Sequence, residues 1–198
     1  MKSKKDKIID AAIDLFAEKG FSNTSTAEIA TLSGVAQGTL FYHFKQKEGI
    51  LCEVLDQVLQ HTTNGYNTID QEDKSGIECV EALLRSESRI VEQHSKKVTV
   101  LIRDMTDEVH QPGTNGFSLI ESFLQHKIDL LCKFIRKGIT DESIRPVAVE
   151  ETAWFLDAAF YGVVHIKLCK HLPIPPLDQH AIELCLSALR PNPNTPSL

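Results

Sequence analysis

Apolar residues recur every three or four positions through most of the chain, which is the spacing of one face of an α-helix. The sequence shows no useful length of the apolar-polar alternation that is typical of strands. The first helical segment, residues 4–19, places Ile8, Ala12, Leu15 and Phe16 on one face. The pattern therefore predicts an all-α fold.

The same spacing predicts eight further helices. They lie at about residues 26–32, 36–44, 47–60, 77–91, 98–109, 117–138, 147–172 and 178–189. A polar, glycine-punctuated stretch at residues 61–76 separates two groups of helices. We therefore expect an N-terminal domain at residues 1–60, a helical body at 61–190, and a proline-rich disordered tail at 191–198.

A helix-turn-helix is predicted at about residues 25–44. Ser25 and Glu28 have the spacing of a capping box, in which each side chain bonds the other residue's amide and a helix begins. Ile29 and Leu32 are expected to face inward. Gly34 can adopt the left-handed conformation that ends one helix and allows a sharp turn into the next. The second helix, residues 36–44, then directs Leu40 and Phe44 to the core.

The other face of the second helix carries groups that suit a DNA groove. Gln37 can address a base edge with two hydrogen bonds, Thr39 offers a hydroxyl and a methyl group, and Gly38 lets the backbone approach a phosphate. We expect Gln37 and Thr39 to read bases. The residues that flank them, expected to hold phosphates, are Thr26, Tyr42, His43 and Lys47. The alternative is a plain helical hairpin with solvated polar residues.

The run from Ser25 to Lys47, STAEIATLSGVAQGTLFYHFKQK, resembles the DNA-binding domain of the tetracycline-repressor (TetR) family in its spacing, turn glycine and aromatic cluster. The resemblance covers about the first 60 residues. It implies a one-component transcriptional regulator, repressor by default, with a DNA-binding domain and a ligand-sensing body. Phe41 departs from the family pattern, in which many members carry a tyrosine whose hydroxyl touches a phosphate; either Phe41 or Tyr42 makes the aromatic contact here.

The charge of the chain is unevenly distributed. The formal net charge is −6, which argues against a protein that coats nucleic acid over its whole surface. Residues 1–47 carry seven lysines and five acidic residues, whereas the remaining 151 residues carry 14 basic and 22 acidic ones. DNA contact is therefore expected only at the N-terminal domain.

The cysteines and the apolar runs indicate a soluble cytoplasmic protein. The five cysteines are scattered and odd in number, which does not suit a disulfide framework. The longest uninterrupted apolar stretch, residues 158–164, has seven residues, far fewer than the roughly 20 that a membrane-spanning helix needs. No secretory signal is visible at the N-terminus.

The helices at residues 117–138 and 147–172 carry more apolar surface than a tightly packed pair needs, and the TetR resemblance implies a ligand cavity between such helices. We expect Phe123, Trp154 and Phe160 to supply its walls and Arg103 or His126 a polar contact. The expected effector, of unknown identity, is a hydrophobic molecule with an acidic or hydrogen-bonding group. The alternative is that these side chains only fill the core.

The last two helices are expected to form a homodimer, because one domain reads only a few base pairs and a palindromic operator needs two. A four-helix bundle with the symmetry mate would use a set of apolar and small residues. They are Phe155, Ala159, Gly162, Ile166, Ile182, Leu186 and Leu189.

Other chemistry is weakly indicated. His165 and Cys169 could present two metal ligands on one helix face, but no second pair with suitable spacing occurs. Phosphate-binding, dinucleotide-binding and hydrolase motifs are absent, so no catalytic residue, metal or cofactor is expected. The alternative function is a helical enzyme or metal-binding bundle that carries an incidental helix-turn-helix.

Overall fold

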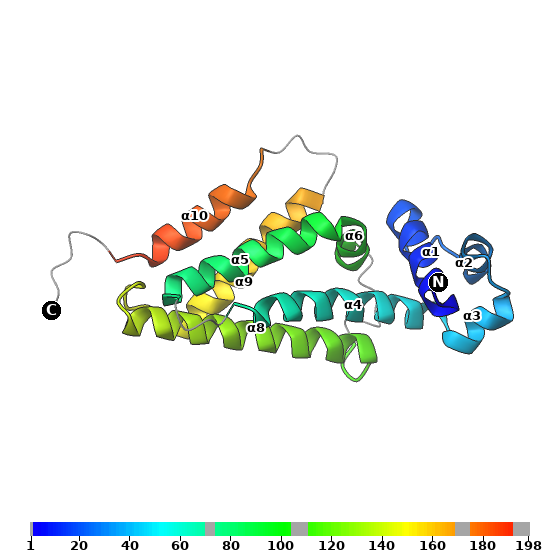
Figure 1. The fold of residues 1–198 in the computed structure, drawn as a ribbon, viewed down its shortest axis with the longest axis horizontal. Helices are drawn as coiled ribbons and strands as arrows, with labels where there is room; N and C mark the ends of the chain where they lie inside the picture. The colour runs from blue at the N-terminus through cyan, green and yellow to red at the C-terminus, as the bar shows by residue number, and fades with distance from the viewer. Residues whose placement is uncertain (1, 70–73, 104–110, 169–174, 192–198) are drawn as a thin grey trace. The chain divides into compact units, whose positions relative to one another are not determined.

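The computed structural model describes residues 2–69, 74–103, 111–168 and 175–191. Within these ranges it contains nine helices and no strands, in agreement with the all-α prediction (Figure 1). The helices are α1 (Lys4–Lys19), α2 (Thr26–Ser33), α3 (Gln37–His43), α4 (Lys47–Asn67), α5 (Gly76–Gln93), α6 (Ser95–Arg103), α8 (Asn115–Thr140), α9 (Val149–Leu168) and α10 (Asp178–Leu189).

The chain divides into two compact units. The first unit comprises residues 1–61 and 94–122, and the second comprises 62–93 and 123–198. The first unit is thus larger than the predicted N-terminal domain of residues 1–60, because it also includes α6 and the beginning of α8. The division of the chain by function, into DNA binding and ligand sensing, stays a prediction.

The core of the first unit is built from the inward faces of α1 to α4. Ile8, Phe16, Ile29 and Leu40 are fully buried in it, as their spacing predicts. Leu32 is a correction, because 56% of its surface is exposed. The short helix α2 buries only Ile29 and Ala30, so Leu32 lies on its exposed side.

Helix α6 is attached to α1 within the first unit. Lys96 Nζ pairs with Asp14 at 2.6 Å, and Val100 is fully buried in the same core. The Arg103 guanidinium donates to the carbonyl groups of Phe16 and Ala17, which lie in the last turn of α1. A cation is favourable there because the last carbonyls of a helix carry partial negative charge.

The core of the second unit lies among the C-terminal end of α4, α5, α8, α9 and α10. Leu83, Phe134, Leu156 and Phe160 are almost fully buried in it. Gly76 at the start of α5 lies so close to the Gly138 backbone near the end of α8 that a Cβ on Gly76 would meet backbone atoms, whereas a Cβ on Gly138 would meet the Ile144 side chain. Small residues at this crossing therefore position two of the longest helices.

Helix α4 extends to Asn67, beyond its predicted end at Gln60. Val58, Thr62 and Tyr66 are all buried and form one face of α4, although most of the residues around Thr62 and Tyr66 are polar. Other predictions fall outside the described residues: Met105 and Val109 of the sixth expected helix, Cys169, and the tail from residue 192. Among the residues that the structure describes, no helix is both long and apolar enough to cross a membrane.

Candidate nucleic-acid interface

Helix α2 begins at the predicted capping box. Ser25 Oγ accepts a hydrogen bond from the Glu28 amide at 3.2 Å, and the Glu28 carboxylate accepts one from the Ser25 amide at 2.8 Å. At the other end, Gly34 has φ of 67° and its amide donates to the carbonyl groups of Ala30 and Thr31. These two local features fix the length of α2 and the turn into α3.

The Glu28 carboxylate gives this cap a pH dependence. A hydrogen bond from Lys19, together with the bonds from the Ser25 amide and hydroxyl, lowers the pKa of Glu28 from 4.5 to about 2. Because the pKa is lower in the folded protein, the stabilisation is present above pH 4.5 and is lost as the pH falls toward 2. We expect Glu28→Gln to flatten the pH dependence of unfolding in this window, measured by circular dichroism. Glu18→Gln, at an exposed site of the same unit, should leave the profile as in the wild type.

Helix α3 presents a continuous exposed face. Gln37, Gly38 and His43 are exposed and Thr39 is half-buried, whereas Leu40 on the opposite side is fully buried. Nothing lies within 4 Å of a Cβ placed on Gly38, so a phosphate could approach the backbone there. Tyr42 has 85% of its surface exposed and Phe41 has 44%, so exposure favours Tyr42 for the aromatic contact. Thr26, in the first turn of α2, is half-buried.

Lys47 is held by the first unit itself. Its ammonium donates to the carbonyl groups of Phe21 at 2.7 Å and Thr24 at 2.8 Å, and it lies 4.2 Å from the centre of the Phe21 ring. These contacts join the first turn of α4 to the segment that precedes α2. The structure therefore gives Lys47 a positioning role, which the sequence analysis did not predict.

Two further lysines lie close to the end of α3. A concave region of about 460 Å³ is lined by Lys5, His43, Phe44, Lys45, Gln46, Gly49 and Glu53. Lys45 is exposed, whereas Lys5 pairs with Glu53 at 2.8 Å and lies over the Phe44 ring. The sequence analysis did not name Lys5 or Lys45 as phosphate contacts. The spacing Lys45-x-Lys47, directly after the second helix of the motif, could have indicated Lys45 as a phosphate contact.

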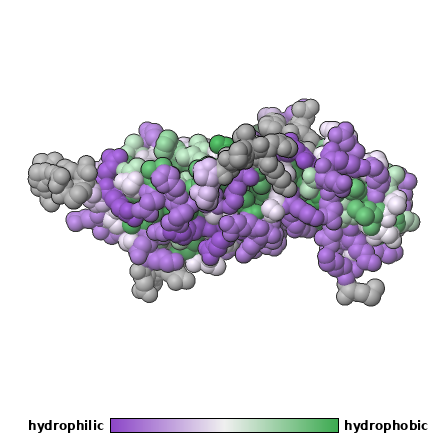
Figure 2. All heavy atoms as spheres, turned by 90° about the horizontal axis from the view of Figure 1, so that it is seen from above, coloured by the Kyte–Doolittle hydropathy of each residue, from purple (hydrophilic) through white to green (hydrophobic). Residues whose placement is uncertain are grey.

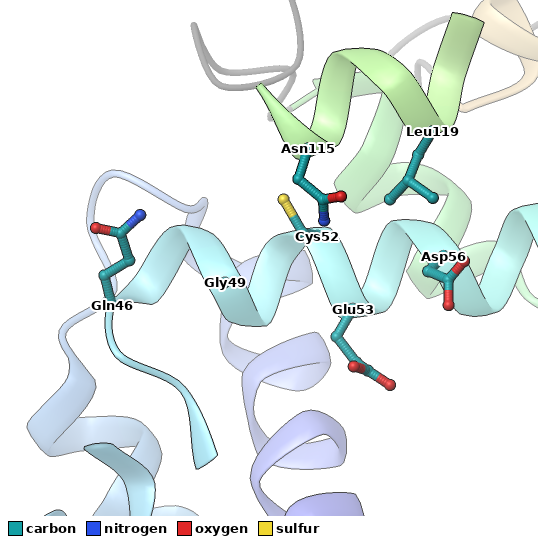
Figure 3. Close-up of a pocket in the computed structure, with 7 residues that line it drawn as sticks. All are labelled: Gln46, Gly49, Cys52, Glu53, Asp56, Asn115 and Leu119. Carbon is teal, nitrogen blue, oxygen red and sulfur yellow. The ribbon is translucent and has the colours of Figure 1, made fainter. Parts of the chain in front are cut away.

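A second hollow in the first unit, of about 430 Å³, lies between α4 and the beginning of α8. Figure 3 shows Cys52 of α4 facing Asn115 and Leu119 of α8, while Glu53 and Asp56 project from another side of α4. Both carboxylates have partners in the protein, Lys5 for Glu53 and Gln60 for Asp56. The residues that line this hollow include no lysine or arginine.

Comparison with known proteins places this interface in a family. Residues 8–54 match the family model described as bacterial regulatory proteins, tetR family. This part of the chain is similar to the DNA-binding domain of the TetR family. The TetR resemblance deduced from Ser25 to Lys47 is confirmed by this match, and the relatives that the chain resembles are transcriptional regulators.

Individual relatives and solved structures support the same assignment. The HTH-type transcriptional repressor KstR2 of Mycolicibacterium smegmatis is 26% identical over 144 residues, which cover 73% of this chain and 69% of that protein. QacR of Staphylococcus aureus is 46% identical over 52 residues, 26% of this chain and 28% of QacR. The structure of KstR2 from Mycobacterium tuberculosis has a TM-score of 0.77 with 21% identity, over 97% of each chain. This chain thus shares its fold with KstR2 over almost its full length.

The residues expected to line a ligand cavity do not all lie in one unit. Arg103 belongs to the first unit, where it binds the end of α1. Phe123, His126, Trp154 and Phe160 belong to the second. Phe160 is buried, Phe123 stacks on Tyr66 with ring centres 6.1 Å apart, and 47% of Trp154 is exposed. Phe123, His126 and Phe160 thus share the second unit, and the ligand cavity stays a prediction.

The residues expected at a dimer interface also fall into two groups. Phe155 and Ile166 on α9 are exposed, and Ala159 and Gly162 are half-buried. Ile182, Leu186 and Leu189 are instead buried in the protomer, so they are not free to contact a second copy. Their periodicity identified a buried face correctly, but the structure covers that face with the chain's own helices. The large exposed apolar residue of α10 is Leu184.

Proposed function

We propose that this TetR-family chain is a repressor that binds a palindromic operator as a homodimer and is released by a small molecule. The observation that carries the proposal is the exposed face of α3. The capping box fixes the start of α2, which precedes α3, and Lys5 and Lys45 lie close to the end of α3. DNase footprinting on the DNA upstream of the chain's own coding sequence tests it. A protected palindrome is the expected result, and protection of bulk DNA to the same extent would contradict the proposal.

Within the interface we assign base reading to Gln37 and Thr39, which lie in the middle of the α3 face. We assign phosphate contacts to Thr26, Tyr42 and His43, and to Lys45 in addition. Lys47 has two backbone carbonyls as partners, so its contribution combines positioning of the segment before α2 with its positive charge near DNA. The backbone contacts fix the register, and the base contacts supply the sequence preference.

The two roles predict different responses to mutation. Gln37→Ala should cost about 1–3 kcal/mol on the operator and relax sequence preference at one position. Lys45→Ala should weaken binding to all DNA sequences alike and reduce the salt dependence by about one phosphate contact. Fluorescence anisotropy over a range of salt concentrations, on operator and scrambled duplexes, measures both effects.

Lys47→Ala and the exposed Lys4→Ala serve as comparisons. Lys47→Ala should lower the melting temperature of the first unit as well as the affinity for DNA, because it removes two charge-assisted hydrogen bonds. Lys4→Ala should change neither stability nor sequence preference. If Gln37→Ala and Lys45→Ala lost the same DNA affinity on operator and scrambled duplexes, the assignment of base reading to Gln37 and phosphate contact to Lys45 would be contradicted.

The homodimer is proposed to form through α9 and α10. A groove of about 560 Å³ between them is lined mainly by apolar side chains, among them Phe155, Ala159, Leu184 and Cys185. Exposed Trp154 and Tyr161 extend the apolar surface of α9 beyond the groove. Figure 2 shows one face of the molecule, on which green hydrophobic areas lie among purple hydrophilic ones. An exposed apolar face of this kind is typical of a protein interface.

Release by a small molecule is proposed for the second unit. The FadR protein of Bacillus subtilis, solved in complex with stearoyl-CoA, has a TM-score of 0.74 and 21% identity to this chain, over 93% of this chain and 99% of FadR. A helical protein of this fold can therefore accommodate a ligand, although this likeness does not identify the effector here. An effector must bind the two states with different affinities, and tenfold weaker DNA binding requires about 1.4 kcal/mol of coupling.

A further inference from the structure

Two histidines from distant parts of the sequence meet in the first unit. His61 belongs to α4 and is the last residue of the first segment of that unit, and His94 directly precedes α6. Their ring centres are 5.1 Å apart, and the ring planes are inclined at 59°. His61 is exposed and His94 is half-buried, so water and dissolved ions can reach both rings. These two side chains are hereafter the histidine pair.

The spacing of the histidine pair is that of two imidazoles bound to one metal ion. A transition metal lies about 2.0–2.1 Å from a ligating imidazole nitrogen, and therefore about 3.2 Å from the ring centre. A tetrahedral angle between two such ligands places the ring centres about 5.2 Å apart. The observed separation of 5.1 Å agrees with this value, and the inclination of 59° is not that of stacked rings.

A backbone carbonyl determines the tautomer of His61. Its Nδ1 lies 2.5 Å from the carbonyl oxygen of Gln57, one turn earlier on α4. A carbonyl oxygen only accepts, so in the neutral ring Nδ1 carries the proton and Nε2 carries the free lone pair. A metal-ligating histidine usually has this arrangement, in which its second nitrogen donates to a carbonyl or a carboxylate.

The surroundings of His94 suit the same role. Burial, together with the neighbouring His61 and Lys97, lowers the pKa of His94 below its ordinary value, so its ring is neutral at pH 7.5 and has a free lone pair. Lys97 is a positive charge that opposes a cation here, but its ammonium donates to the side-chain oxygen of Gln57 at 3.0 Å. That bond links α6 to the turn of α4 that orients His61, and so helps to hold the pair together.

We propose that the histidine pair binds one divalent transition-metal ion of the class that prefers imidazole nitrogen, such as Zn²⁺. The protein would supply Nε2 of His61 and one ring nitrogen of His94. Water would complete the coordination, because no group of three or more candidate ligands occurs among the residues that the structure describes. The bound ion would join α4 to the start of α6 and stabilise the first unit. This site goes beyond the proposed function and does not depend on it.

Isothermal calorimetry with zinc chloride tests the site. The full chain, free of any polyhistidine tag, is treated with EDTA, dialysed and titrated at pH 7.5. We expect zinc to bind and to raise the melting temperature of the protein. Mg²⁺ should not bind, because it requires oxygen ligands. The absence of zinc binding would overturn the inference, as would Mg²⁺ binding of equal strength.

Histidine variants locate the ion. His61→Gln and His94→Gln should each weaken zinc binding at least about tenfold, or roughly 1.4 kcal/mol, and should remove the effect of zinc on the melting temperature. His180→Gln, at an exposed position on α10, is the matched control and should bind zinc like the wild type. Circular dichroism verifies that each variant is folded. Undiminished zinc binding by either variant of the pair, or an equal loss in His180→Gln, would overturn the inference.

Spectroscopy distinguishes this site from ring packing alone and from cysteine ligands. In imidazole ¹H–¹⁵N NMR spectra, zinc should shift the Nε2 resonance of His61 and one nitrogen resonance of His94, and it should leave those of His180 unchanged. Rings that only pack against each other would show no shift. With Co²⁺ as the probe, a thiolate charge-transfer band would assign the ion to a cysteine. Either of these two results would overturn the inference.

Discussion

Phe155→Glu is expected to convert the proposed dimer to a monomer and to reduce operator affinity by at least about 100-fold, or roughly 2.7 kcal/mol. Phe155 lines the groove between α9 and α10, and 66% of its surface is exposed in the protomer. In a symmetric dimer one substitution introduces two carboxylates, so the desolvation cost is incurred twice. Each released protomer would then contact one half-site alone.

Analytical ultracentrifugation at micromolar concentration and fluorescence anisotropy on the operator measure the two effects together. The exposure of Phe155 implies that the protomer stays folded, which circular dichroism verifies. Gln125→Glu adds the same charge at an exposed position on α8 outside the groove, and it should remain a dimer with unchanged affinity. A dimeric Phe155→Glu protein with full operator binding would rule out this interface.

The N-terminal interface could be predicted from the sequence because its determinants are local. The Ser25–Glu28 capping box and the left-handed Gly34 each involve residues at most a few positions apart. The exposed face of α3 follows from the burial of Leu40 on the opposite side. The prediction that Leu32 faces inward was wrong. A two-turn helix makes too few contacts for its apolar spacing to determine which residues are buried.

Long-range pairing could not be predicted in the same way. The periodicity of Ile182, Leu186 and Leu189 shows that one face of α10 is buried, but it does not show whether the same chain or a second copy covers it. The buried ion pairs of Lys127 with Glu87 and Asp157 join residues from three separate helices, and no local spacing links them. The end of α4 was missed because Thr62 interrupts an apolar pattern that Tyr66 completes.

The crossing of α5 and α8 should be the most sensitive backbone position of the second unit. A Cβ on Gly76 would lie 2.0 Å from the Gly138 nitrogen and 2.5 Å from the Phe134 carbonyl oxygen. These are backbone atoms, so relief requires a shift of a whole helix. The same shift would disturb the hydrogen bonds from the Gly76 amide to Asp141 at 2.7 Å and from the Ile77 amide to Ser143 at 3.1 Å.

We therefore expect Gly76→Ala to destabilise the second unit by about 3 kcal/mol, and to lower its melting temperature by roughly 6–12 °C. Gly49→Ala is the control, because nothing lies within 4 Å of a Cβ placed there and Gly49 lies in the first turn of α4. Alanine there should leave stability unchanged or raise it by up to about 0.5–1 kcal/mol. Thermal unfolding followed by circular dichroism, with hydrogen exchange to assign the loss to α5 and α8, measures both. Equal melting temperatures for the two variants would show that the helices can separate at this crossing at little cost.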